Sequence, residues 1–79
     1  MIYVEIIFGS NDIKDIQTVM PQAPSVNDNI EMPYGVVKFN NGVELGETTF
    51  KVKSVDWIFK EQSMMPKYKF NKVQVWVNW

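Results

Sequence analysis

The sequence predicts a mainly β protein: a single domain, residues 1–79, of about five strands that form a small curled sheet or barrel. Apolar and polar residues alternate along most of the chain, with the two-residue period of a β-strand. Turn-forming residues interrupt these runs at short intervals. The longest run, FKVKSVDWIF at residues 50–59, changes phase at Ser54. A β-bulge causes such a phase change and bends the strand, as a small curled sheet requires.

The first strand is expected at residues 2–8, where every second residue is apolar, and residues 9–12 (GSND) then form a turn. Residues 11–20 fit two interpretations. The spacing of Ile13 and Ile16 is typical of one short helix, whereas alternation from Ile16 to Met20 suits a strand that returns antiparallel to the first. The β-branched residues of this segment favour the strand, and the helix stays open.

Residues 24–30, PSVNDNI, predict a tight turn that leads into another extended segment. Asn27 and Asp28 suit the turn because their side chains tolerate positive φ. The pattern Pro-x-Val-Asn-Asp-x-Ile after a first strand resembles the entry turn of SH3-like small barrels, including short phage proteins of that kind. The resemblance covers these seven residues and implies no functional residue. We expect the curled sheet to be an SH3-like or OB-like barrel.

A hairpin is expected within residues 34–45. A two-residue loop would place apolar residues opposite charged ones. A three-residue loop at residues 40–42 makes both faces consistent and requires positive φ at Gly42. The pairs across this hairpin are then Phe39 with Val43, Val37 with Leu45, and Lys38 with Glu44.

Residues 50–59 are expected to be the central strand. Its apolar face consists of Phe50 and Val52 before the bulge, and of Val55, Trp57 and Phe59 after it. We expect Trp57 to be almost fully buried, because it lies in the middle of this face. Residues 61–67 then predict a loop, which is unusual in carrying two adjacent large apolar residues, Met64 and Met65.

Residues 68–79 predict the last strand, and Trp76 interrupts its polar side. The apolar face of this strand is expected to consist of Val73, Val75, Val77 and Trp79. Two interpretations of Trp76 stay open. It anchors an interface, because Trp is a preferred anchor and a last strand is often a sheet edge that can pair with a partner. Alternatively, Met64 and Met65 pack over it, because Met fills irregular gaps.

The composition excludes several kinds of site. The chain has no Cys, no His and no Arg, so it lacks thiolate and imidazole groups for catalysis or metal binding. The carboxylates that lie close in sequence, such as Asp12 with Asp15, fit a solvated surface. We therefore expect no enzyme, no metal and no cofactor. The net charge of −1 provides no general attraction to nucleic acid.

The function that we expect is non-catalytic binding of a protein partner, either a host protein or a second copy of the chain. The residues expected to bind are Trp76, Met64, Met65, Lys67, Tyr68 and Lys69. Many Asn, Ile and Lys together with no Arg are typical of AT-rich codons. This composition and the small size suggest a phage or mobile-element protein that inhibits a host defence protein.

Two other functions stay open. Lys67, Tyr68, Lys69 and Phe70 alternate basic and aromatic residues, as in small barrels that bind single-stranded nucleic acid. The mouth of the barrel is another place where a small ligand could bind. We expect a cytoplasmic protein without a membrane segment, because the N-terminus lacks the basic region of a signal peptide and no apolar run approaches about 20 residues.

Overall fold

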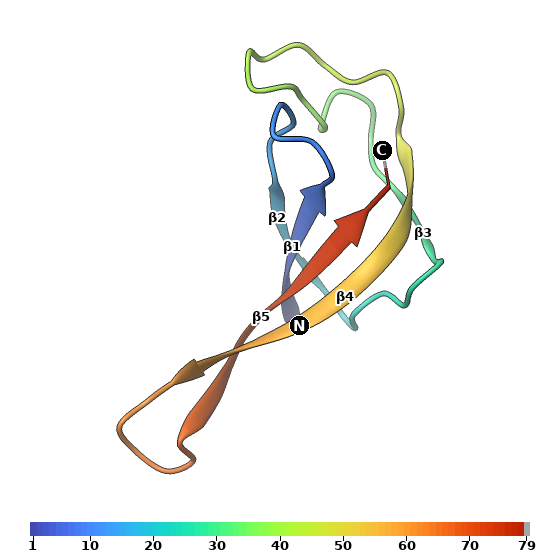
Figure 1. Ribbon diagram of the computed structural model, residues 1–79. Helices are drawn as coiled ribbons and strands as arrows, with labels where there is room; N and C mark the ends of the chain where they lie inside the picture. The colour runs from blue at the N-terminus through green and yellow to red at the C-terminus, as the bar shows by residue number, and fades with distance from the viewer. Residues whose placement is uncertain (79) are drawn as a thin grey trace.

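The computed structural model describes residues 1–78, which contain five strands and no helix (Figure 1). The strands are β1 (Ile2–Phe8), β2 (Ile16–Met20), β3 (Asn29–Glu31), β4 (Thr49–Glu61) and β5 (Tyr68–Val77). They form one mixed sheet in the order β2-β1-β5-β4-β3, which curls into a half-barrel. The prediction of a small, mainly β, curled sheet is confirmed. Over the described chain, no helix is long and apolar enough to span a membrane.

The last strand lies in the middle of the sheet, between the first strand and the central one. β5 runs parallel to β1 over residues 73–77 and antiparallel to β4 over nearly its whole length. The edges of the sheet are β2 and β3 instead. The expectation that β5 is an edge is therefore wrong, because the two ends of the chain come together and β1 pairs with its outer side.

Residues 16–20 form β2, so the strand interpretation of this segment is correct. β2 returns antiparallel to β1, with Ile2 opposite Met20 and Ile6 opposite Ile16. Ile13 precedes this strand and is buried in the core, where its backbone forms a bridge with Phe39. Ile13 and Ile16 therefore have helical spacing without forming a helix: each packs on the same core from a separate extended segment.

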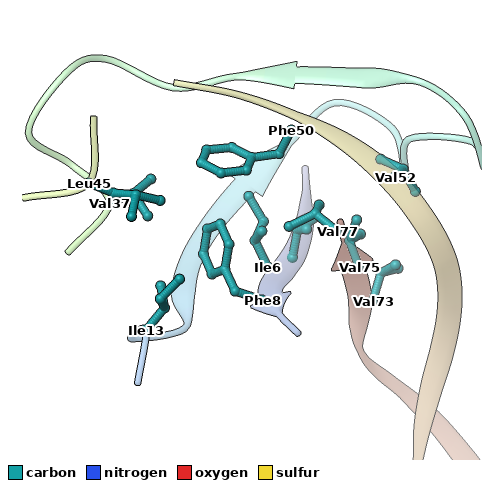
Figure 2. Close-up of a cluster of buried hydrophobic side chains, with 11 residues drawn as sticks. Ile6, Phe8, Ile13, Val37, Leu45, Phe50, Val52, Val73, Val75 and Val77 are labelled. Atoms are coloured by element: carbon teal, nitrogen blue, oxygen red, sulfur yellow. The ribbon is translucent and has the colours of Figure 1, made fainter. Parts of the chain in front are cut away.

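The core fills the concave side of the half-barrel and consists of apolar side chains from β1, β4, β5 and the segments that connect the strands (Figure 2). Phe8 and Phe50 meet edge to face, with ring centroids 5.0 Å apart, which is a favourable aromatic geometry. The buried residues are Val4, Ile6, Phe8, Ile13, Val37, Leu45, Phe50, Val52, Val73, Val75 and Val77. Trp79, which was expected to continue this face, lies outside the described residues.

The predicted hairpin register within residues 34–45 is confirmed. The Phe39 N–H donates to the Val43 carbonyl at 2.8 Å, the Leu45 N–H donates to the Val37 carbonyl at 2.9 Å, and Gly42 has φ +90°. The Asn40 N–H also donates to the Asp12 carbonyl in the loop between β1 and β2, at 2.7 Å. The hairpin therefore closes this end of the half-barrel.

The turn within residues 24–30 also forms as predicted. Asn27 has φ 74°, and the Ser25 N–H donates to the Asp28 carboxylate at 2.8 Å. The Asn27 N–H donates to the Val52 carbonyl at 2.9 Å, which fixes the turn against β4. The resemblance of this turn to SH3-like barrels stays a prediction.

β4 is bulged where the phase of its sequence changes. The pairing between β4 and β5 shifts between Val52 and Ser54, and it shifts again between Ile58 and Phe59. The bulge at Ser54 is thus confirmed. The prediction that Trp57 is almost fully buried is wrong, because 52% of its surface is exposed. β4 and β5 continue together beyond β1 and β3 at this point, and within residues 1–78 no second layer covers the apolar face of β4.

Candidate functional site

The ends of β4 and β5 leave the half-barrel together as a two-stranded ribbon, at the lower left of Figure 1. β1 pairs with β5 only at residues 73–77, and β3 pairs with β4 only at residues 49–51. Within the described residues, neither edge of the ribbon is therefore paired with another strand. We call residues 57–72 the arm. It makes the molecule elongated, with principal extents of 46 × 26 × 19 Å.

One face of the arm is aromatic. Trp57 pairs with the buried Val73, so the two side chains lie on the same side of the sheet. Phe70 lies between Trp57 and Phe59, with its ring centroid 5.7 Å from the first and 5.9 Å from the second. Phe70 is half-buried, whereas 57% of Phe59 is exposed. The three rings therefore extend the core face of the barrel onto an uncovered surface.

The opposite face of the arm is cationic. Because side chains alternate along a strand, Ile58 and Lys60 point away from the aromatic face. Lys60 pairs with Lys69, and Ile58 pairs with Lys72. The arm contains four Lys and one acidic residue, Glu61, whereas the rest of the chain contains four Lys and eight acidic residues. The arm is thus a basic element on an acidic body.

The tip of the arm brings together five of the six residues that the sequence predicted to bind. The Gln62 N–H donates to the Lys67 carbonyl at 2.8 Å, and the Lys67 Nζ lies 3.5 Å from Glu61 Oε1. The Lys67 Nζ also lies 5.8 Å from the centroid of the Tyr68 ring. The five residues are Met64, Met65, Lys67, Tyr68 and Lys69, all of them exposed.

Trp76, the sixth predicted residue, lies elsewhere. It is eight positions from Tyr68 along β5, which corresponds to roughly 26 Å. Its side chain is on the convex face, opposite to the buried Val75 and Val77, and 37% of it is exposed. Met64 and Met65 are exposed at the far tip of the arm, so the interpretation that they pack over Trp76 is wrong. A role for Trp76 in an interface stays a prediction.

Sequence reasoning placed Trp57 and Phe59 on the buried face of the central strand and assigned Phe70 to a possible nucleic-acid site, and so missed the aromatic face. The signal that could have found this face is strand length. β4 has 13 residues, whereas β1 has 7 and β3 has 3. A strand so much longer than its neighbours must extend beyond the layer that they form.

The chemistry of the arm suits binding to a surface. It offers aromatic rings, thioethers and ammonium groups, and within residues 1–78 no group of three or more acidic side chains could hold a metal ion. Aromatic residues and Met are enriched where proteins contact one another. Comparison with protein-family models, with curated proteins and with solved structures finds no match to this chain.

Proposed function

We propose that the protein is a non-catalytic protein-binding module and that its arm docks into an apolar groove of a partner protein. The exposed aromatic face of the arm carries the proposal. Trp57 and Phe59 each expose more than half of their surface on a ribbon of only two strands. Such a ribbon is at best marginally stable in water, and contiguous exposed apolar surface typically marks an interaction site. A partner that covers the rings would stabilise the arm as it binds.

The charges of the arm define the kind of partner. Lys67 and Lys69 lie at the tip, and Lys60 lies on the cationic face. A groove with an apolar floor and Asp or Glu residues along its rim would be complementary to this arrangement. Charges at the rim of an interface mainly accelerate association and select the partner, while the buried rings supply most of the affinity.

Inhibition of a host protein by a phage or mobile-element protein is a narrower form of the same proposal. Its support is the small size of the chain and its AT-rich residue usage. An arm that fills a groove of an enzyme would block that groove without any chemistry of its own.

The test compares two variants with the unmodified chain. Trp57→Ala/Phe59→Ala removes the two most exposed rings of the arm, and Tyr34→Ala removes an exposed ring from the body. Proteins captured by the tagged chain from a lysate of its source organism are identified by mass spectrometry, purified and titrated calorimetrically. We expect the arm variant to weaken binding at least about thirtyfold, or about 2 kcal/mol, and Tyr34→Ala to have little effect.

Two results would refute the proposal. One is a captured protein that binds the arm variant as tightly as the unmodified chain. The other is binding of labelled oligonucleotides that weakens steeply between two salt concentrations, which would identify the basic arm as a nucleic-acid site. Light scattering of the purified chain shows whether the groove belongs to a second copy.

A further inference from the structure

A cavity of about 610 Å³ lies on the convex face of the sheet, beside the loop between β1 and β2. Its lining includes Ile7 and Trp76, which are neighbours in the parallel ladder of β1 and β5. Ligand pockets in proteins usually have volumes of about 300–1,000 Å³. The cavity is separate from the arm, so an inference about it goes beyond the proposed function.

Glu5, one of the lining residues, is held in place by a hydrogen bond and an ion pair. Glu5 Oε1 accepts a hydrogen bond from Gln74 Nε2 at 2.9 Å, and it forms an ion pair with Lys72 Nζ at 3.2 Å. The bond from Gln74, aided by Lys72, lowers the pKa of Glu5, although burial opposes this shift. Glu5 therefore stays ionised and fixed in orientation, and the carbonyl oxygen of the Gln74 amide remains able to accept a hydrogen bond.

The lining also offers a carboxylate, that of Asp15, with no hydrogen-bond donor on it. Within residues 1–78, the Asp15 side chain makes no hydrogen bond or ion pair, although the charge of Lys72 acts on it. Burial, followed by the nearby charge of Glu5, raises the pKa of Asp15. A ligand that donates a hydrogen bond to Asp15 would relieve this destabilisation, because a hydrogen bond to the charged form of a carboxyl favours that form.

The balance of charges indicates a neutral ligand. Glu5 is already paired with Lys72, and Lys14 lines the same cavity as Asp15. Two acidic and two basic groups therefore offset one another, and neither an anion nor a cation is preferred. Besides Ile7 and Trp76, the lining provides carboxylate, amide and hydroxyl groups, which come from Asp15, Gln74, Asn40 and Ser10 among others.

We propose that this cavity binds a neutral saccharide, with one face of the sugar ring on Trp76 and the hydroxyl groups on Asp15 and Gln74. A hydroxyl group donates one hydrogen bond, so two hydroxyl groups of one sugar ring can donate to the Asp15 carboxylate and to the Gln74 carbonyl oxygen. The less polar face of a sugar ring fits an exposed Trp, whose large ring packs against apolar surface. This site lies on the convex face, away from the barrel mouth where the sequence suggested a small ligand.

The test is a titration of the ¹⁵N-labelled chain followed by NMR. The neutral probes are glucose, galactose, mannose, N-acetylglucosamine and maltose, and the charged probes are choline and inorganic phosphate. The indole N–H signal of Trp76 is assigned with Trp76→Phe, because the chain has three Trp. We expect at least one saccharide to shift this signal in a saturable way.

Three variants locate the site and identify the class of ligand. Trp76→Ala should weaken saccharide binding at least about tenfold, and its amide spectrum should show an intact fold because Trp76 lies outside the buried core. Asp15→Asn keeps an acceptor without the charge, so it should weaken binding of a neutral ligand only a few-fold. Trp57→Ala on the arm should have no effect on saccharide binding.

The saccharide proposal is refuted by any of three results. These are no shift with any saccharide, a shift that persists undiminished in Trp76→Ala, and saturable binding of choline or phosphate alone. None of them affects the proposal for the arm, which is tested with different variants and a different partner.

Discussion

Trp57 and Val73 lie opposite each other across β4 and β5, yet Val73 is fully buried and 52% of Trp57 is exposed. Both side chains point to the concave side of the sheet. Val73 is covered because it is also paired with Val4 of β1, whereas no strand in the described part of the chain pairs with the β4 edge at Trp57. Val73 is thus the last buried residue of the core on this side, and the exposed arm begins at Trp57.

The position of Trp57 predicts a small effect of Trp57→Ala on stability. The half-exposed ring lies beside that of Phe70, and such an aromatic pair contributes about 0.5–1.5 kcal/mol. Loss of a buried aromatic side chain costs about 3–5 kcal/mol, which we expect for Phe50→Ala. Urea denaturation of the two variants measures the difference. Equal losses would mean that Trp57 belongs to the core.

Gly42 is expected to resist replacement because its φ of +90° lies in the left-handed region. A β-branched residue is strained there, so Gly42→Val should destabilise the protein by about 1–2 kcal/mol. Gly46→Val is the matched control, because an added Cβ meets open space at both glycines and Gly46 has no positive φ. Thermal unfolding should show a lower Tm for the first variant alone. A similar Tm for both would contradict the hairpin geometry.

Lys69→Glu is expected to change stability and binding in opposite directions. Lys60 and Lys69 are directly opposite on the cationic face, where like charges repel. The change creates an opposite-charge pair and should stabilise the fold by about 0.2–1 kcal/mol. It should also slow association with a partner whose groove is acidic.

Lys51→Glu is the control for this experiment, because it changes the net charge equally at an exposed position away from the arm. Denaturation and stopped-flow association rates provide the two measurements. Equal association rates for both variants would show that the charge of the arm does not select the partner.

The shifted carboxyl groups of Glu5 and Asp15 predict opposite dependences on pH. The hydrogen bond from Gln74 lowers the pKa of Glu5 below its ordinary value of 4.5, so its stabilising effect is present above that pH and is lost as the pH falls through the lowered pKa. Glu5→Gln should therefore lower the Tm at neutral pH, and the difference should vanish in acid.

The effect of Asp15 on stability has the opposite dependence on pH. Burial and then the charge of Glu5 raise its pKa above the ordinary 3.8, so the folded state holds its proton more tightly than the unfolded state does. Asp15→Asn should raise the Tm at neutral pH, and the gain should disappear as the pH falls below 3.8. A gain that is independent of pH would show that the carboxyl group is not the cause.

Local features of this protein follow from its sequence alone. The strand at residues 2–8, the bulge at Ser54 and the loop at residues 40–42 are all present as predicted. Positive φ at Asn27 and Gly42 was equally predictable. These features depend on side-chain alternation, on the register across one turn and on the steric freedom of single residues, so neighbours within a few positions are sufficient to determine them.

Only the tertiary structure decided which apolar faces are covered. Alternation assigns Trp57 and Val73 to one face, but whether that face is buried depends on how far β1 and β3 extend along the sheet. The same holds for the central place of β5 and for the distance of Trp76 from the tip of the arm. A face is buried only when a second surface covers it, and that surface comes from distant parts of the chain. The two-residue period of a single strand carries no information about how long those distant strands are or how they pair.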